Sequence, residues 1–285
     1  MKPRKPSILL VGSGNLAQAL APALQQAGYP IIAIAARNAS PSRRRAKALA
    51  EKVGARPLLL ADAGPIADIV WLCHTDDELA KTAQSLAKQR GWRGKIALHS
   101  SGALSSDVLL PLRRAGAYVA SLHPMMTFIA GTAPEIADVP FAVEGDARAV
   151  IAANNIVRDL GAQVFELKKQ SKVLYHALGS FSSPMIVAAL ATAERVGKAA
   201  GLGQQQTRAI MGPILRQTLT NYLDHGGASA FSGPIRRGDL ETVRRHLQEL
   251  KRVPDALEVY RALVKSALRD LPSTRKKQLL KLLGS

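Results

Sequence analysis

The chain has 285 residues, of which 47% are hydrophobic and 21% are charged, a composition typical of a globular protein and unlike that of a disordered one. A single cysteine, Cys73, excludes an internal disulfide and favours a reducing compartment, for which the cytoplasm is the simplest assignment. The formal net charge is +18, but the basic residues are scattered and only 4% of residues are aromatic, so we expect an anionic small molecule and no specific nucleic-acid binding.

The start of the chain, MKPRKPSILLVGSG, imitates the basic front of a signal peptide. Its apolar run is short and leads into a glycine turn, so we expect no export signal. We also find no apolar stretch that approaches the roughly 18 residues needed to span a bilayer, and therefore expect no transmembrane helix and no membrane partner.

The N-terminal part of the sequence alternates short apolar runs with helical periodicity. Strands and helices are predicted over SILLVG, NLAQALAPALQQAG, PIIAIAA, residues 42–54, DIVWLCH, residues 76–89, KIALHSS, SSDVLLPLRR, AYVASLH, VPFAVEG, DARAVIAANNIVRDL and QVFEL. This alternation is typical of an α/β fold with a doubly wound, mostly parallel sheet that helices cover on both faces.

After residue 168 the pattern becomes helical throughout. Breaks are predicted near residues 201–203, residues 226–234, Pro254 and Pro272. We therefore expect two domains: an α/β domain over residues 1–168 and an all-helical domain over residues 169–285.

The first predicted strand leads into a glycine turn that opens a helix. Gly12, Gly14 and Ala17 form a G-x-G-x-x-A pattern, which gives a tight turn, a close approach to a pyrophosphate and close packing of helix on strand. An ordinary glycine turn is the alternative, but the position between strand and helix favours a dinucleotide site. The residues expected at this turn are Gly12, Ser13, Gly14, Asn15, Leu16 and Ala17.

The end of the second predicted strand indicates which dinucleotide binds. NAD enzymes usually carry an acidic residue there, whereas an arginine accommodates the 2′-phosphate of NADP. This position holds Arg37, Asn38 follows it, and Arg43 to Arg45 open the next helix within reach of the same phosphate, Arg43 being the one included among the cofactor-binding residues. Because no acidic residue competes at this strand end, we expect NADP or NADPH, the alternative being a solvated helix start.

Three histidines, His74, His99 and His123, each come at the end of a predicted strand. The carboxyl ends of parallel strands line the ligand crevice, so all three are expected near the cofactor. A zinc site is one alternative, but the wide spacing and the lack of accompanying carboxylates argue against it, and we expect no metal. For each histidine a polar cap on the strand end is a further alternative, and for His74 it is the favoured one, although we also include His74 among the cofactor-binding residues.

His123 differs from the other two because Pro124 follows it and restricts the backbone. A hydride transfer to or from a carbonyl carbon needs a proton partner for the oxygen, and histidine titrates near neutral pH. We therefore expect His123 to be the acid/base catalyst. Ser100 and Ser101 are expected to bind the substrate's oxygen or acid group, with a helix cap as the alternative for each.

Several segments resemble known protein families. SLHPMMTF is similar to the His-Pro-Met segment of prephenate dehydrogenases and to the His motif of hydroxyacyl-CoA dehydrogenases, and YHALGSFSSPMIVAALATAERVGKAAGL resembles a helix of pyrroline-5-carboxylate reductases. Together HSSGAL, SLHPMMTF, PFAVEGD, YHALGSFSSP and AFSGPIRRGD resemble a bacterial family of Rossmann-like proteins with a C-terminal domain of unknown function. That family is related to pyrroline-5-carboxylate reductases and deazaflavin-dependent NADP reductases.

The resemblance covers nearly the whole chain and implies an acid/base role for His123, a Rossmann domain, a helical domain like that of 6-phosphogluconate dehydrogenase, and a homodimer through the helical domains. It implies no particular substrate. Lys172 and His176 occupy a place like the Lys-x-x-x-Asn pair of β-hydroxyacid dehydrogenases, although the Asn is absent. Their spacing puts both on one helix face, where we expect them to polarise or orient substrate, a solvated pair being the alternative.

The segment AFSGPIRRGD combines turn-forming residues with Arg236 and Arg237. Such a loop suits the binding of a carboxylate or phosphate of the substrate, although a charged turn between helices has the same pattern.

These predictions combine into an NADP-dependent oxidoreductase that acts on a small anionic carbonyl, hydroxyl or imine substrate. Two alternatives remain. One is an NADP-binding regulatory or sensor protein without catalytic turnover, which the missing Asn beside Lys172 favours. The other is a nucleic-acid-binding module, which the positive charge alone suggests.

Overall fold

The computed structural model describes residues 4–132 and 134–284, and it divides into two compact units. The first unit ends at Phe181 and the second begins at Ser182. The predicted domain boundary at residue 168 falls earlier. The difference arises because the helix Lys172–Ser182 (α6) contacts the sheet of the first unit through the side chains of Lys172 and Tyr175.

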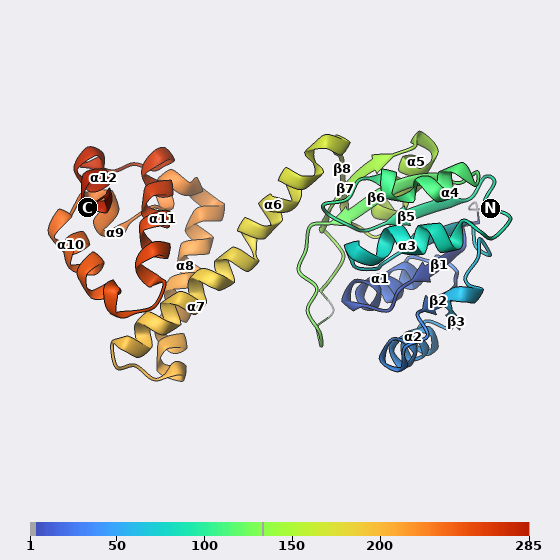
Figure 1. Ribbon diagram of the computed structural model, residues 1–285, viewed down its shortest axis with the longest axis horizontal. Coiled ribbons are helices and arrows are strands. Elements are labelled where there is room, and N and C mark those ends of the chain that lie inside the picture. Colours follow the sequence, from blue (N-terminus) through green and yellow to red (C-terminus); the bar gives the residue numbers. More distant parts are fainter. Residues whose placement is uncertain (1–3, 133, 285) are drawn as a thin grey trace. The chain divides into compact units, whose positions relative to one another are not determined.

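Eight strands form one sheet in the first unit: β1 (Ile8–Val11), β2 (Ile31–Ala36), β3 (Arg56–Leu59), β4 (Ile69–Leu72), β5 (Ile96–His99), β6 (Tyr118–Pro124), β7 (Pro140–Gly145) and β8 (Gln163–Glu166). Their order across the sheet is β3-β2-β1-β4-β5-β6-β7-β8. Figure 1 shows this sheet with its covering helices. All neighbouring pairs are parallel except β6 and β7, which are antiparallel. The order reverses between β1 and β4, so the carboxyl ends of these strands border a crevice.

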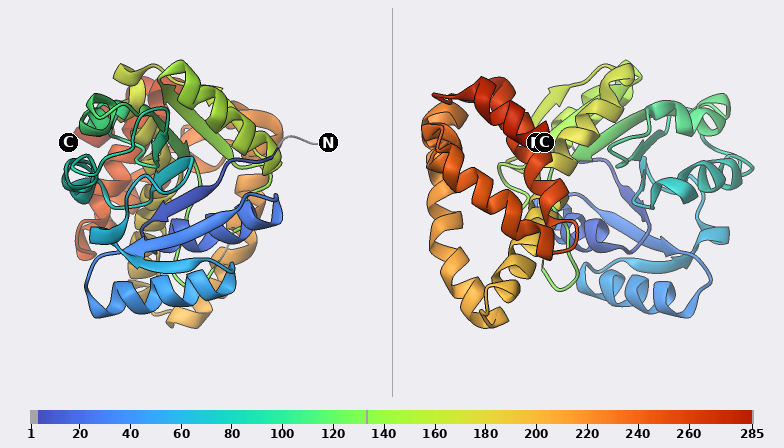
Figure 2. Two further views of the ribbon diagram at one scale, coloured as in Figure 1. Left: turned by 90° about the vertical axis from the view of Figure 1, so that its right-hand side faces the viewer. Right: turned by 60° about the vertical axis from the view of Figure 1, so that its left-hand side comes forward.

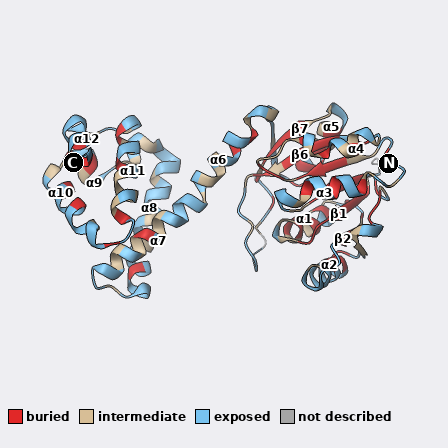
Figure 3. Ribbon diagram, in the orientation of Figure 1, coloured by how far each residue is buried: buried red, intermediate tan, exposed pale blue. Residues whose placement is uncertain are grey.

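Helices cover both faces of this sheet: α1 (Asn15–Gln26), α2 (Ser40–Lys52) and α5 (Ala147–Asp159) on one face, and α3 (Asp76–Leu86) and α4 (Leu110–Arg114) on the other. Each face has its own apolar core. Leu20 and Ile156 belong to the first core, and Leu79 and Leu112 belong to the second. Figure 3 shows the central strands as almost entirely buried, which explains why their sequences are apolar throughout instead of alternating. The predicted doubly wound, mostly parallel sheet is confirmed.

The edge strand β3 is absent from the sequence prediction. Its sequence RPLL contains Pro57, and all four of its residues are exposed or only partly buried. Edge strands tolerate proline and exposure because one of their sides lacks a partner, and the same features remove the apolar pattern by which a strand is recognised.

The second unit is helical, as predicted. It contains α7 (Pro184–Ala199), α8 (Gln204–Ala230), α9 (Gly233–Arg237), α10 (Leu240–Glu249), α11 (Ala256–Asp270) and α12 (Lys276–Gly284). Helices α9 to α12, drawn in orange to red in Figure 2, enclose a small core that includes Val243, Leu268 and Leu279. Gly226 has a non-helical backbone with φ 75° and interrupts α8 inside the predicted break at residues 226–234.

The two consecutive helices α6 and α7 are unusually apolar and exposed. By length and composition alone, residues Lys169–Ala199 could cross a membrane, and only 6% of the relevant window is buried. The sequence expectation that no stretch is long and apolar enough to span a membrane is therefore wrong when judged by length and composition. The same features are also those of a helix that packs against another protein surface, and the backbone leaves the helical conformation at Ser183.

Candidate active site

The predicted nucleotide turn lies between β1 and α1. Gly12 has φ +122°, and a Cβ atom there would lie 2.7 Å from the carbonyl oxygen of Cys73, so the fold itself requires glycine. Gly14 precedes α1 as its N-cap, and a Cβ atom there would meet no atom within 4 Å. Ala17 is fully buried against the sheet. Gly14 therefore leaves open space directly in front of a helix start whose first N–H groups have no helical partner.

A hollow opens in front of this turn. Its lining residues are Gly12, Ser13, Gly14, Ala36, Arg37, Ser42, Arg45, Cys73, His74, Thr75 and Glu78. Among the described residues, nothing hydrogen-bonds to His74 Nδ1, although this atom is buried. Burial, and then the nearby Arg37, lower the pKa of His74 to about 4, so the ring is neutral at pH 7. A buried ring nitrogen without a protein partner suits a ligand contact.

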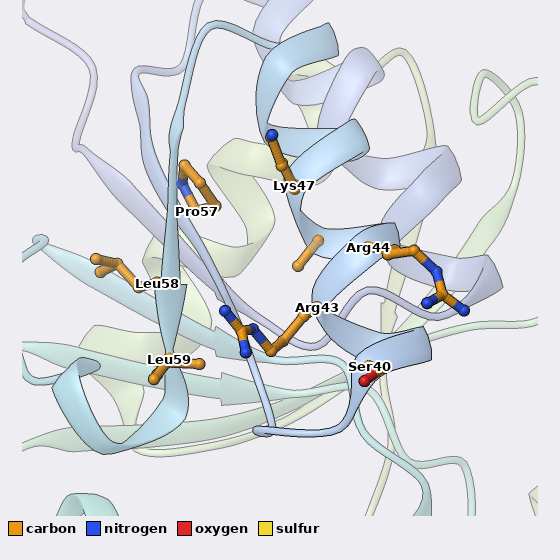
Figure 4. A pocket seen from close by; sticks show the side chains of 8 residues that line it. Ser40, Arg43, Arg44, Lys47, Pro57, Leu58 and Leu59 are labelled. Atoms are coloured by element: carbon orange, nitrogen blue, oxygen red, sulfur yellow. The ribbon is translucent and has the colours of Figure 1, made fainter.

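The predicted phosphate-binding residues gather around the start of α2. Arg37 and Arg45 line the hollow in front of the glycine turn. Arg43 instead points into a neighbouring hollow of about 400 Å³ between α2 and β3, as Figure 4 shows. Its Nη1 donates to Asn38 Oδ1 at 3.4 Å. Of the predicted run Arg43 to Arg45, it is thus Arg45 that lines the hollow in front of the glycine turn.

An acidic side chain also lines the hollow. Glu78 lies in the first turn of α3, and its Oε2 is 3.4 Å from Arg37 Nη1. The sequence has no acidic residue at the end of β2, but in the folded chain Glu78 lies beside Arg37, so the expectation that no acidic residue competes there is wrong. The carboxylate comes from the segment after β4, which no spacing rule for β2 would find.

His123 lies near the end of β6, and its Nδ1 is 3.0 Å from the hydroxyl oxygen of Tyr175. The two rings meet edge to face with their centroids 5.5 Å apart. Burial raises the pKa of Tyr175 to about 12, so its hydroxyl stays protonated and can donate to Nδ1. The neutral His123 ring then carries its proton on Nε2.

The acid strength of His123 differs from the expectation. Burial, and then the nearby Lys172 and His176, lower its pKa to about 4. The ring is therefore neutral at pH 7 in the free protein, whereas the sequence argument assumed titration near neutrality.

Lys172, at the start of α6, is almost completely buried, with 1% of its surface exposed. Its Nζ donates to Ser121 Oγ at 2.7 Å and to the carbonyl oxygen of Ser101 at 3.0 Å. Burial lowers the pKa of Lys172, and the carboxylate of Glu144 opposes this shift. An amine is thus held at the carboxyl ends of β5 and β6.

His176 lies one turn beyond Lys172 on α6, with its ring centroid 6.1 Å from that of His123. Gly102 lies close to both rings, because a Cβ atom on Gly102 would lie 2.5 Å from His176 Cδ2 and 2.8 Å from His123 Nε2. The structure therefore brings the three predicted catalytic residues, His123, Lys172 and His176, together within the first unit.

His99 has a structural part in this cluster. Its Nδ1 accepts from the N–H of Ser101 at 3.1 Å, so its Nε2 carries the proton and donates to the carbonyl oxygen of Ser105 at 3.2 Å. Burial, and then Lys172, lower the pKa of His99 to about 3. The ring is fully buried and braces the turn after β5.

The two predicted substrate-binding serines both have internal partners. Ser100 Oγ accepts from Trp71 Nε1 at 2.7 Å. Ser101 Oγ accepts from the N–H groups of Ala103 and Leu104 at 3.2 and 2.9 Å. The bonds of Ser101 close the turn after β5, whereas the cap of the next helical segment is Ser105. A substrate contact of either hydroxyl stays a prediction.

The other predicted anion-binding pair, Arg236 and Arg237, lies in α9 of the second unit. Arg236 Nη1 donates to the carbonyl oxygen of Ala228 at 3.0 Å. Their contact with a substrate likewise stays a prediction. In the described part of the chain, no group of three or more His, Cys, Asp or Glu side chains is placed to hold a metal ion.

Sequence reasoning missed Ser121 and Tyr175. Ser121 stands two residues before His123 on the same strand, and alternation places both side chains on one face. Tyr175 stands three residues after Lys172 and shares its helix face. Either spacing could have found these residues once His123 and Lys172 had been chosen.

Comparison with protein-family models assigns both parts of the chain. Residues 1–124 match the model described as a Rossmann-like domain, and residues 139–267 match the model described as a domain of unknown function, DUF2520. A search of the curated proteins finds no match.

Solved structures share this fold over nearly the whole chain. A Bacteroides fragilis protein provisionally described as an NADP oxidoreductase is 23% identical, with a TM-score of 0.77 over 92% of this chain and 98% of that chain. A protein from Thermotoga maritima is also 23% identical, with a TM-score of 0.70 over 90% and 95%. An imine reductase from Myxococcus stipitatus in complex with NADP+ is 16% identical, with a TM-score of 0.66 over 93% and 94%. The chain shares the fold of these proteins, and its two parts match the models of a Rossmann-like domain and of DUF2520.

Proposed function

We propose that the protein is an NADP-dependent oxidoreductase that transfers a hydride between the nicotinamide and a small anionic carbonyl, hydroxyl or imine substrate. One contact carries the proposal: Asn15, at the glycine turn, donates from Nδ2 to the carbonyl oxygen of Phe128 at 3.0 Å. Phe128 lies in the segment that follows His123. The nucleotide turn and the histidine cluster therefore share the carboxyl edge of the parallel strands, where dinucleotide enzymes of this fold bind their ligands.

The residues at the glycine turn fit a dinucleotide. The open space at Gly14 and the unpaired N–H groups of α1 suit a pyrophosphate, and His74 Nδ1 offers a contact that no described residue uses. Arg37 and Arg45 supply positive charge for a 2′-phosphate. The similar structures add support, because an imine reductase with NADP+ and a reductive aminase from Aspergillus terreus with NADPH share the fold. A bound NADPH would supply the hydride.

Within the cluster, His123 donates a proton to the substrate or accepts one from it. Because Tyr175 occupies Nδ1, the Nε2–H group of His123 is the one available to a substrate oxygen or nitrogen. A negative charge on a bound substrate would stabilise the protonated ring and raise the pKa of His123 from about 4 towards neutrality. An anionic substrate would in this way turn a neutral hydrogen-bond donor into a proton donor.

The other polar groups orient the substrate. The buried ammonium group of Lys172 attracts an anionic group, and His176 adds a second imidazole beside His123. Ser100 and Ser101 are proposed to contribute hydroxyl contacts, and Arg236 and Arg237 to bind the acid group of the substrate. Because Gly102 has no Cβ atom, both imidazoles fit beside its backbone.

The protein is further proposed to form a homodimer through its helical region. Ile210 and Ile214 are four residues apart on one face of α8 and more than half exposed, and Leu223 is 78% exposed. The described residues leave most of each of these side chains exposed, and a second copy of the chain would remove them from water. The reducing cytoplasm is the proposed location, and neither a membrane nor a specific nucleic acid is a proposed partner.

The test of the nucleotide site is a comparison of the wild type with Gly14→Ala. The added methyl group meets no atom of the folded chain, so the free energy of unfolding should change by less than about 1 kcal/mol. Calorimetry should show NADP+ and NADPH bound to the wild type, and affinity lowered about tenfold or more in the variant. A wild type without affinity for either nucleotide would refute the proposal.

The test of the chemistry is NADPH oxidation across a panel of small oxo acids and imines, first with the wild type and then with His123→Asn. Asparagine keeps a polar side chain of moderate size but cannot titrate, so turnover should fall on the order of 100-fold. Unchanged turnover would remove His123 from the mechanism.

One observation favours a second function, that of an NADP-binding sensor without turnover. The pKa of His123, at about 4, leaves the free protein without a protonated imidazole there at neutral pH. A sensor would bind NADPH tightly yet leave it unoxidised across the whole panel, and the reductase would not.

A further inference from the structure

Glu78 stands in the nucleotide hollow, and the proposed function does not use it. Its Oε2 lies 3.4 Å from Arg37 Nη1, and both side chains line the hollow together with Arg45. The side chain of Glu78 is 24% exposed and that of Arg37 is 54% exposed. An ion pair this open to solvent is weak, so Arg37 is free to rearrange around a ligand.

Two charged groups contact Glu78. They are Arg37 after β2 and Lys81 on α3, whose Nζ is 3.8 Å from Glu78 Oε1. Arg45 on α2 lines the same hollow. Among the described residues that line the hollow, Glu78 is the one carboxylate. A ligand that enters the hollow therefore meets two guanidinium groups and one group of opposite charge.

We propose that Glu78 sets the preference between NADP and NAD, by repelling the 2′-phosphate of the first and accepting a hydrogen bond from the 2′-hydroxyl of the second. This inference rests on the proposed function, because it requires a dinucleotide at the glycine turn. A phosphate monoester carries close to two negative charges at neutral pH, so a carboxylate in the same hollow opposes it. A hydroxyl group, in contrast, is a donor that a carboxylate accepts.

Arg37 and Arg45 favour NADP over NAD, and Glu78 thus makes the difference between the two affinities smaller. Acidic residues that bind the ribose in dinucleotide folds usually stand at the end of the second strand. Here that place holds Arg37, and the carboxylate reaches the same hollow from the first turn of α3. The site accordingly combines a cation suited to NADP with an anion suited to NAD.

Two other roles for Glu78 predict different results. A carboxylate in the first turn of a helix stabilises that helix through its dipole, and its loss would then leave the binding of both nucleotides unchanged. A carboxylate that only holds Arg37 in position would, when removed, weaken the binding of NADP+. Repulsion of the 2′-phosphate predicts the reverse, a tighter complex with NADP+.

The test is calorimetric titration of the wild type and Glu78→Gln with NADP+ and with NAD+, in the same buffer at low and at moderate salt. We expect NADP+ to bind the variant on the order of five- to tenfold more tightly at low salt, with a smaller gain at moderate salt because ions screen the exposed charges. NAD+ should bind equally well or more weakly. The matched control is Glu51→Gln on α2, whose partner is Lys47 and which does not line the hollow, and its affinities should stay within about twofold.

The outcomes separate the two proposals. If the wild type binds neither nucleotide, the proposed function falls. If the wild type binds NADP+ but Glu78→Gln leaves the ratio of the two affinities unchanged, or weakens NADP+, the role of Glu78 is refuted and the proposed function stands. Thermal unfolding of the variant without nucleotide verifies that it is folded.

Discussion

Lys172 Nζ lies 2.7 Å from Ser121 Oγ, and this contact places a buried ammonium group at the ends of two parallel strands. The same nitrogen also donates to the carbonyl oxygen of Ser101 at 3.0 Å. Only 1% of the Lys172 surface is exposed, so its charge acts in a medium that screens it poorly. The contact fixes one positive charge in the cluster that contains His123.

Replacing this charge should cost activity more than stability. Lys172→Met keeps a long unbranched side chain but removes the ammonium group and leaves two acceptors without their donor. The lost hydrogen bonds destabilise the fold, whereas removal of a buried charge stabilises it. Because the two effects oppose each other, we expect the free energy of unfolding to change by about 2 kcal/mol or less in either direction. NADPH-dependent turnover should fall on the order of 100-fold, because one preorganised charge at the reacting atoms is worth that much.

A nearby lysine provides the control for this experiment. Lys169 is partly exposed and pairs with Asp107 at 2.6 Å, outside the cluster. Lys169→Met should retain most of the wild-type turnover. Equal losses in the two variants would mean that Lys172 has no special role in the reaction.

Gly102 tests whether the positions of the two imidazoles matter. In Gly102→Ala the new methyl group would lie 2.5 Å from His176 Cδ2 and 2.8 Å from His123 Nε2, so one or both rings must move. We expect a loss of about 1–3 kcal/mol in stability and a clear fall in turnover. Gly203→Ala is the control, because its Cβ atom meets nothing within 4 Å. A fully active Gly102→Ala variant would show that the present ring positions are not needed.

The sequence predicted the doubly wound sheet because the buried strands are continuous apolar runs. DIVWLCH and KIALHSS, for example, both correspond to strands that lie inside the sheet. The edge strand β3 escaped prediction because exposure and Pro57 remove that signal. Helix α6 was assigned to the helical domain because its sequence is helical, although its contacts belong to the sheet.

The part of the candidate site that follows the strands directly was predictable, because the carboxyl ends of parallel strands lie at one edge of the sheet. His123, the glycine turn and Arg37 follow from this rule. Glu78 does not, because its approach to Arg37 depends on how far β4 and α3 carry the chain across the sheet. The pKa of His123 was beyond reach for the same reason, since burial in the folded chain and the nearby Lys172 and His176 lower it.

The buried histidines make the first unit sensitive to acid. The pKa of His99 is about 3 in the folded state and near its ordinary value of 6.5 in the unfolded chain. As the pH falls below 6.5, His99 takes up a proton in the unfolded chain but stays neutral in the folded state. The free energy of unfolding therefore decreases between pH 6.5 and 3. Between pH 8 and pH 5, His99 alone should cost about 2 kcal/mol.

Urea unfolding followed by tryptophan fluorescence measures this loss, because Trp71 and Trp92 are both buried in the first unit. His99→Asn keeps an acceptor for the N–H of Ser101 but cannot titrate, so its stability should fall less between pH 8 and pH 5. Parallel pH dependence in the wild type and the variant would contradict the assignment.

The proposed dimer depends on the apolar face of α8. Ile214→Glu places a charge in that face and should convert the protein to a monomer, which light scattering coupled to size-exclusion chromatography can measure. Gln205→Glu adds the same charge at an exposed position nine residues earlier, on the opposite side of the same helix, and serves as the control. A wild type that is monomeric at micromolar concentration would rule out the dimer.

The tautomer of His123 gives a test that needs no substrate. Tyr175 donates to Nδ1 from 3.0 Å, so long-range ¹H–¹⁵N spectra of the wild type should show an unprotonated Nδ1 and a protonated Nε2. Tyr175→Phe removes the donor without enlarging the side chain, and the ring should then populate both tautomers. The control is Tyr118→Phe, since Tyr118 is exposed at the start of β6. The peaks are assigned by comparison with His123→Asn, and an unchanged Nε2–H tautomer in Tyr175→Phe would show that another contact orients the ring.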